Sequence, residues 1–152
     1  MKLEKWALIA EIGSGVAIVV TLVVLIGETR ANTDAIKIQT AEAAFSTSAQ
    51  SFYYPEGNVA LERAAEIGFS ELETDERAHA VALMASIFTM YDNNYYQYRR
   101  GTLDDEIHQA YRRRLVALMS IPLYQERWPI MKSNHTEAFQ RYVDEIIEEL
   151  EE

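Results

Sequence analysis

The sequence predicts an all-α protein in which one hydrophobic helix at the N-terminus precedes a small helical bundle. Only three prolines, at positions 55, 122 and 129, interrupt the 152 residues. Apolar residues recur at intervals of three and four, the spacing of one face of an α-helix, and strand signals are absent. We therefore divide the chain into a transmembrane anchor (residues 1–27), a juxtamembrane helix (28–54) and a soluble helical domain (55–152).

The anchor prediction rests on the apolar run that ends at Gly27. A helix rises about 1.5 Å per residue, so about 20 residues cross a hydrocarbon layer of about 30 Å. The uncharged stretch from Ile12 to Gly27 spans only about 24 Å. The crossing therefore has to begin near Trp6 and to include Glu11 at its edge. Glu11 either turns towards the lipid headgroups or contacts a partner inside the membrane.

Small residues give the same stretch a second candidate contact. Gly13 and Ala17 lie four residues apart, a spacing that lets two membrane helices approach closely. Together with Glu11 they form the predicted intramembrane contact, either with another membrane protein or with a second copy of this chain.

A cleaved signal peptide is the alternative to an uncleaved anchor. Lys2 and Lys5 precede the apolar run, and Thr29 with Ala31 provides a small-residue cleavage site. The run is long for a signal peptide and charged residues flank that site, which favours the anchor. The positive charges at the start favour a cytoplasmic N-terminus and a domain on the outer, periplasmic side.

Composition excludes several classes of function. Residues 1–27 contain two lysines and two glutamates, so the rest of the chain carries the whole net charge of −10. Such a surface does not attract nucleic acid or anionic lipid headgroups. The chain has no cysteine, which excludes disulfides, thiolate nucleophiles and cysteine-ligated metals. We predict no cofactor and no nucleic-acid partner.

The anchor helix is expected to continue through the juxtamembrane segment, because no proline occurs between Gly27 and Pro55. Small and apolar residues recur along this segment in a heptad-like series. Phe45 and Phe52 are expected to dock on the domain, whereas Glu42 interrupts the series and disfavours a strong coiled coil.

Caps and apolar stripes predict four helices in the domain, over residues 59–67, 75–100, 104–121 and about 134–152, with a proline-bounded connection at 122–129. The predicted core of the second of these helices is Val81, Met84, Ile87, Phe88, Tyr91, Tyr95 and Tyr98. That of the last helix is Phe139, Tyr142, Val143, Ile146 and Leu150.

Three features carry a family resemblance. Residues 28–35 read Glu-Thr-Arg-Ala-Asn-Thr-Asp-Ala directly after the hydrophobic helix, Gly101-x-Leu103-Asp104 lies inside the helical domain, and Trp128 precedes the last helix. The chain thus resembles a loose group of small uncharacterised bacterial single-pass membrane proteins with a helical soluble domain. The resemblance implies a bacterial inner-membrane setting and assigns no site residues.

The sharpest enzymatic hypothesis is a di-metal carboxylate site, which helical bundles build from Glu-x-x-His motifs. Glu76 and His79 have this spacing, and Asp105 and His108 come close to it. Each pair lies at the start of its helix, and a short connection makes the two helices antiparallel. The pairs would then lie about 30 Å or more apart. We therefore predict no metal site and no catalytic residue, and we expect the three histidines to be polar surface residues.

The segment from Tyr91 to Arg100 is the most unusual of the domain. Its tyrosines repeat at helical spacing, and tyrosine and arginine are enriched at protein interfaces. The same tyrosines can instead complete a small core with their hydroxyls at its rim. Both interpretations stay open, and the candidate interaction residues of the domain are Tyr91, Tyr95, Tyr96, Arg99, Arg100 and Trp128.

These patterns predict a non-enzymatic single-pass membrane protein that acts as an interaction module or as an accessory subunit of a membrane assembly. Its expected partners are the lipid bilayer and either other membrane proteins or a second copy. The alternative is a membrane-tethered sensory domain with an aromatic ligand pocket between its helices. A di-metal enzyme comes third.

Overall fold

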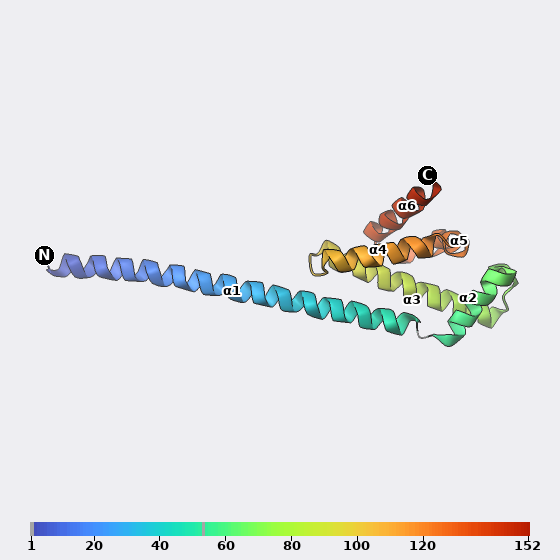
Figure 1. The fold of residues 1–152 in the computed structure, drawn as a ribbon, viewed down its shortest axis with the longest axis horizontal. Coiled ribbons are helices and arrows are strands. Elements are labelled where there is room, and N and C mark those ends of the chain that lie inside the picture. Colours follow the sequence, from blue (N-terminus) through green and yellow to red (C-terminus); the bar gives the residue numbers. More distant parts are fainter. Residues whose placement is uncertain (1, 53) are drawn as a thin grey trace. The chain divides into compact units, whose positions relative to one another are not determined.

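The computed structural model describes the backbone of residues 2–52 and 54–152, and the side chains of residues 11, 13–46 and 54–152. Helices make up most of the described part of the chain and no strand occurs in it, which confirms the predicted all-α class (Figure 1). The helices are α1 (Lys2–Phe52), α2 (Pro55–Ile67), α3 (Thr74–Arg99), α4 (Asp105–Met119), α5 (Pro122–Met131) and α6 (Glu137–Glu151). Two short 3-10 helices, η1 (Phe69–Glu71) and η2 (Lys132–Asn134), join them.

The chain divides into two compact units, residues 1–38 and residues 39–152. The first unit is the N-terminal part of α1. The second unit contains the end of α1 and the bundle of helices α2 to α6. The uninterrupted α1, of 51 residues, confirms that the hydrophobic helix continues through the predicted juxtamembrane segment.

The end of α1 belongs to the core of the second unit through a small residue. Ala44 is buried in the same apolar cluster as Leu103 and Tyr111. Phe45 contacts the bundle, with its ring centroid 6.3 Å from that of Tyr111, but its side chain stays half-exposed. Alanine rather than phenylalanine faces the bundle because a small side chain lets the backbone of α1 approach closely. The docking prediction for Phe52 falls on a side chain outside the described residues.

Helix α3 supplies the largest part of the domain core. Met84, Ile87, Phe88 and Tyr91 are buried, as the apolar stripe predicts. Val81 is exposed, so its placement in the core was wrong. The buried positions at this end of α3 are Ala80 and Leu83 instead, in the clusters that α2 helps to form.

The last helix buries Phe139, Val143 and Ile146, as predicted. Tyr142 packs partly buried against the same cluster. Leu150 is exposed, against the prediction, because it lies in the last turn of α6 and belongs to neither core cluster.

Local signals placed several helix ends correctly. The side chain of Asp104 caps α4 by accepting from the backbone N–H of Glu106 at 2.9 Å. Gly101 has a φ of 73°, a left-handed conformation that glycine adopts without strain, and it ends α3. The start of α3 is one residue earlier than predicted: Glu73 is the N-cap, and its N–H donates to the Glu76 carboxylate at 3.0 Å.

Two proline positions were misread. Helix α2 begins at Pro55 and not at Val59, because proline fits the first turn of a helix, where its missing N–H has no partner to lose. The predicted connection at residues 122–129 is helix α5. Pro122 occupies its first turn, and Pro129 lies near its end.

A close contact at Gly57 provides a test of the bundle. A Cβ atom built at this position would lie 2.8 Å from the Leu83 Cβ and would overlap the Tyr54 ring. Gly57→Ala is therefore expected to destabilise the domain by about 1–3 kcal/mol, although alanine is the better helix former. Thermal unfolding checks this, with Glu62→Ala, an exposed change in the same helix, as the control. An equal or higher Tm for Gly57→Ala would show that α2 has room to move.

Candidate functional site

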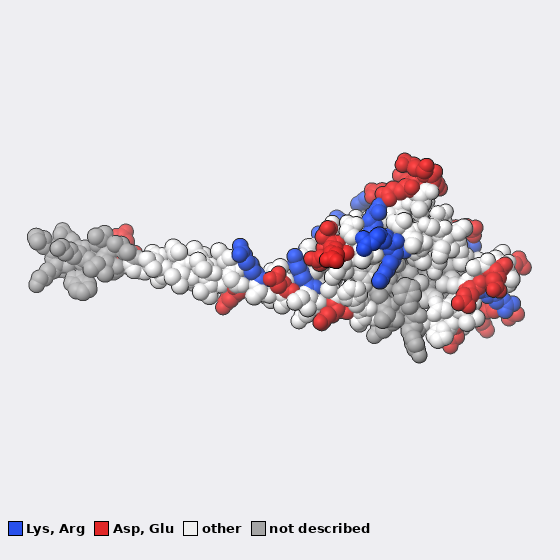
Figure 2. Space-filling model, viewed as in Figure 1, with Lys and Arg blue, Asp and Glu red and all other residues white. Residues whose placement is uncertain are grey.

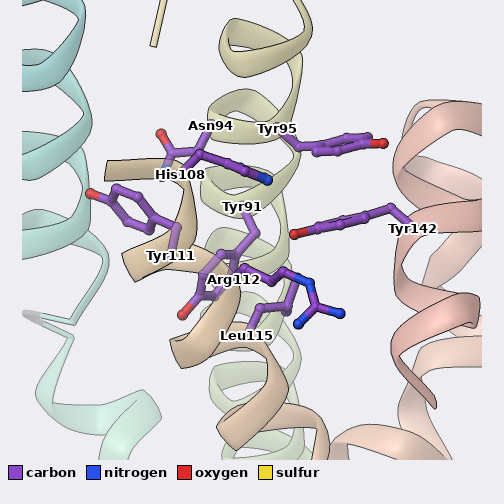
Figure 3. Close-up of a pocket in the computed structure, with 8 residues that line it drawn as sticks. All are labelled: Tyr91, Asn94, Tyr95, His108, Tyr111, Arg112, Leu115 and Tyr142. Atoms are coloured by element: carbon purple, nitrogen blue, oxygen red, sulfur yellow. The ribbon is translucent and has the colours of Figure 1, made fainter. Parts of the chain in front are cut away.

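Helices α3, α4 and α6 meet at a group of aromatic and polar side chains, which we call the tyrosine cluster (Figure 3). Its members surround a cavity of about 10 Å³. Small-molecule sites typically measure about 300–1,000 Å³, so the cluster is packed closed to organic ligands in this structure. The members are Tyr91, Asn94, Tyr95, His108, Tyr111, Arg112, Leu115 and Tyr142.

Two flat stacks hold the cluster together. The rings of Tyr95 and Tyr142 are 4.1 Å apart and nearly parallel, at 8°. Their hydroxyls point in opposite directions, that of Tyr95 towards α6 and that of Tyr142 away from α6 (Figure 3). Tyr98, one helical turn along α3, stacks on the His108 imidazole at 3.6 Å and 6°. The stacks join α3 to both α6 and α4.

Burial shifts the titration of the cluster. It raises the pKa of Tyr91 and of Tyr142 to about 12, so both hydroxyls are neutral near pH 7. Burial lowers the pKa of His108, and nearby Arg112 acts in the same direction, against the opposing charge of Asp105. The hydrogen bond from the Tyr98 hydroxyl to the Asp105 carboxylate, at 3.2 Å, raises the pKa of Tyr98. The cluster therefore favours uncharged tyrosine and histidine side chains.

Two polar atoms of the cluster are buried without a hydrogen-bond partner. They are the Nδ2 of Asn94 and the hydroxyl oxygen of Tyr142. A buried group of this kind costs about 1–3 kcal/mol. The Tyr142 hydroxyl thus reduces the stability that its ring contributes.

This hydroxyl leads to a prediction. Tyr142→Phe keeps the stack on Tyr95 and removes the unpartnered group, so it is expected to leave stability unchanged or to raise it by about 1 kcal/mol. Tyr142→Ala removes the ring as well and is expected to cost about 3–5 kcal/mol. Thermal unfolding of the two variants measures both. A large loss in Tyr142→Phe would mean that the hydroxyl has a partner.

The structure separates the candidate interaction residues of the domain into core and surface. Tyr91 and Trp128 are buried, with 5% and 1% of their surface exposed, so they belong to the core of this fold. Tyr95 is half-buried in the tyrosine cluster. Tyr96 is 46% exposed, and the Arg100 guanidinium lies over its ring at 5.5 Å.

Three candidates therefore remain on the surface. We call Tyr96, Arg99 and Arg100 the α3 surface; all three side chains are exposed. Trp128 has a structural role instead. Its Nε1 donates to Asp144 at 2.9 Å, and the Lys132 ammonium donates to the same carboxylate at 2.6 Å.

The histidines are more buried than the sequence indicated. His108 is 6% exposed and the His135 side chain 5%, which overturns the expectation of polar surface residues. His135 stacks on Trp128, and its Nδ1 is 3.5 Å from Asp92. His79 is half-buried, with its Nδ1 2.7 Å from the Tyr54 hydroxyl. The aromatic partners lie far from the histidines in sequence, so no local pattern reports the burial.

The Glu-x-x-His spacing serves another purpose in this fold. Glu76 accepts from the Arg63 guanidinium at 2.8 Å as well as from the N–H of Glu73. Among the described residues, no group of three or more histidine, aspartate or glutamate side chains is arranged to hold a metal ion.

The predicted intramembrane contact, at Glu11, Gly13 and Ala17, lies exposed in the first unit. Within the described part of the chain, Gly13–Ser46 is the helical stretch that is long and apolar enough to cross a membrane. Figure 2 shows an uncharged surface along the N-terminal part of α1, where residues 13–27 contain no charged side chain. A Cβ built at Gly13 would have no neighbour within 4 Å, so the face with Gly13 and Ala17 is open.

The chain matches no protein-family model, no curated protein and no solved structure. The resemblance to small bacterial membrane proteins therefore stays a prediction, and the functional argument rests on the residues themselves.

Proposed function

We propose that the chain is a non-enzymatic single-pass membrane protein that serves as an interaction module or accessory subunit of a membrane assembly. The observation that carries this proposal is the surface of α1. Every large apolar side chain from Val16 to Ile26 is more than half exposed. Such a continuous apolar surface is costly in water, whereas lipid covers it at no cost.

The hydroxyl groups of the same stretch support lipid as its surroundings. Ser14 donates to the backbone oxygen of Glu11 at 2.8 Å, and Thr21 donates to that of Ala17 at 2.9 Å. In a bilayer each polar group has to find its partner inside the protein. Here the helix satisfies both hydroxyls by itself and needs no neighbouring helix to do so.

Two surfaces are proposed for partner binding. In the membrane, the open face of Gly13 and Ala17 lets a second helix approach closely, and Glu11 is an acidic group on another side of the same helix. In the domain, the α3 surface presents a tyrosine and two arginines, a combination that is enriched at the centres of interfaces. Among the described residues, neither Arg99 nor Arg100 has a carboxylate within 4 Å.

Affinity purification of the tagged full chain from native membranes tests the proposal. We expect specific membrane proteins, or a second copy, to co-purify after mild detergent extraction and crosslinking. Recovery of monomer alone would contradict the interaction role. The mass of the purified chain decides between anchor and signal peptide, because cleavage after Ala31 would remove the N-terminal half of α1. A reporter fused to the C-terminus determines on which side the domain lies.

Charge reversal on the α3 surface gives a sharper result. The double variant Arg99→Glu with Arg100→Glu is expected to lose the co-purifying chains at least tenfold, because it removes two guanidinium donors from the contact and reverses the charge that the partner meets. Stability should change by less than about 1 kcal/mol at these exposed positions. Arg113→Glu, an exposed change on α4, is the matched control. Equal losses in the two variants would place the contact elsewhere.

A further inference from the structure

Besides its buried Phe139, Val143 and Ile146 and its ion pairs with Arg112 and Lys132, helix α6 makes two contacts with α3 that differ in chemistry. At its start, Asp92 of α3 accepts from the backbone N–H of Thr136 at 2.9 Å and from the Thr136 hydroxyl at 2.7 Å. Further along, the attachment is the stack of Tyr142 on Tyr95. The first contact is a charged hydrogen-bond pair and the second is aromatic.

The two buried histidines lie beside these two contacts. His135 directly precedes the first one, and its Nδ1 faces the Asp92 carboxylate at 3.5 Å. His108 lies beside the second one, with its ring 6.0 Å from that of Tyr95 and 5.9 Å from that of Tyr142. Among the described residues, no carboxylate lies within 4 Å of His108.

Groups from three helices face His108. On α4 itself, Asp105 lies one turn before it and Arg112 one turn after it. Tyr95 and Tyr98 face it from α3 and Tyr142 faces it from α6. Glu149 of α6 is occupied by Arg112, whose Nη2 donates to both of its carboxylate oxygens at 2.8 and 2.6 Å. The stack on Tyr98 favours a positive charge on the ring, whereas burial and Arg112 oppose it.

We propose that His108 is an acid-sensitive latch for α6: its protonation places a charge inside the tyrosine cluster and releases the helix from Tyr142 onwards. The Asp92–Thr136 contact keeps the start of α6 in place, because both of its hydrogen bonds lie outside the tyrosine cluster and do not involve His108. The released segment exposes Tyr95, which adjoins the α3 surface in the sequence. This inference does not depend on the proposed membrane function.

The direction of the pH effect follows from the burial of His108. Its pKa in the folded protein is lowered from the ordinary value of about 6.5, so the unfolded segment binds the proton more tightly. The stability that the neutral imidazole contributes is fully present above the ordinary value. It is lost as the pH falls below that value towards the lower pKa of the folded state.

Hydrogen exchange of the full chain in detergent tests the latch between pH 7.5 and 5.5. The protection factors of amides in residues 142–149 are expected to fall on acidification, by at most about tenfold per pH unit for a single proton. Amides in the middle of α3 should keep their protection. In His108→Phe, which retains a flat ring without a titrating group, the fall should disappear. His79→Gln, a histidine outside the cluster, is the control and should keep it.

Three results would overturn the proposal: no fall in the unsubstituted chain, an undiminished fall in His108→Phe, or an equal fall throughout the domain. Should His108→Phe fail to fold, the NMR titration of the His108 ring protons in the unsubstituted chain decides. A midpoint below 6.5 that coincides with the loss of α6 protection supports the latch. A midpoint at or above 6.5 contradicts it.

Discussion

Replacing Asp92 by alanine is expected to destabilise the domain by about 3 kcal/mol, because it removes two hydrogen bonds to a charged group, each worth about 1.5–3 kcal/mol. Asp92 is 9% exposed and accepts two hydrogen bonds from Thr136, the residue that caps α6. The substitution leaves the Thr136 N–H and hydroxyl without an acceptor. Domains are stable by only about 5–15 kcal/mol in total, so the full-length variant should unfold at a markedly lower Tm in circular dichroism.

Two further variants make this expectation specific. Asp92→Asn keeps one acceptor oxygen and is expected to lose less than Asp92→Ala. Asp75→Ala, an exposed change in the first turn of the same helix, removes a carboxylate without a buried contact and should lose about 0.5 kcal/mol or less. If Asp92→Ala unfolds at the same temperature as Asp75→Ala, the Asp92–Thr136 contact contributes nothing to the attachment of α6.

The helix ends that the sequence placed well depend on neighbours in the chain. Asp104 reaches an N–H two residues on, and Gly101 needs only its own backbone freedom to end α3. These signals are complete within one turn. Pro122 is a local signal that fits two structures, because proline occurs both in loops and in the first turn of a helix. Local chemistry alone therefore did not distinguish α5 from a connection.

The attachments between helices depend on partners that the sequence does not bring together. Asp92 and Thr136 are 44 residues apart, and nothing near either residue indicates the other. The same holds for Trp128, which is buried by rings from several helices and whose Nε1 donates to Asp144. A periodic signal for α5 was present in the sequence. Its buried residues recur at intervals of four and three, at Tyr124, Trp128 and Met131, which is the spacing of one helix face.

The candidate site was partly predictable for a similar reason. Helical spacing placed Tyr91, Tyr95 and Tyr98 on one face of α3 and left Tyr96 on another. Helical spacing does not indicate which face of α3 packs against the other helices. The structure covers the first face with α4 and α6, so Tyr91 belongs to the core, and it leaves Tyr96 and the neighbouring arginines on the surface.

Placing a charge in the middle of the apolar stretch should separate the chain from the membrane. Val16 lies midway between Trp6 and Gly27, and its side chain is 58% exposed. Val16→Arg is expected to raise the free energy of insertion by about 3–4 kcal/mol, since arginine costs about 2.5–3.5 kcal/mol at the helix centre and the favourable valine is lost. That difference lowers the ratio of inserted to non-inserted chain by about a hundredfold to a thousandfold. Alkaline extraction of membranes followed by sedimentation measures it.

The control for this variant is the same residue outside the apolar layer. Thr33→Arg lies beyond Gly27 on the polar part of α1, where arginine meets water, and it should remain in the sedimented fraction. The domain of Val16→Arg should keep its Tm, because residues 1–38 form a unit of their own. A Val16→Arg chain that stays in the membrane would mean that α1 is not the anchor. A chain that leaves the membrane with its domain intact would assign membrane attachment to the lipid-compatible surface of α1 and not to the acidic domain.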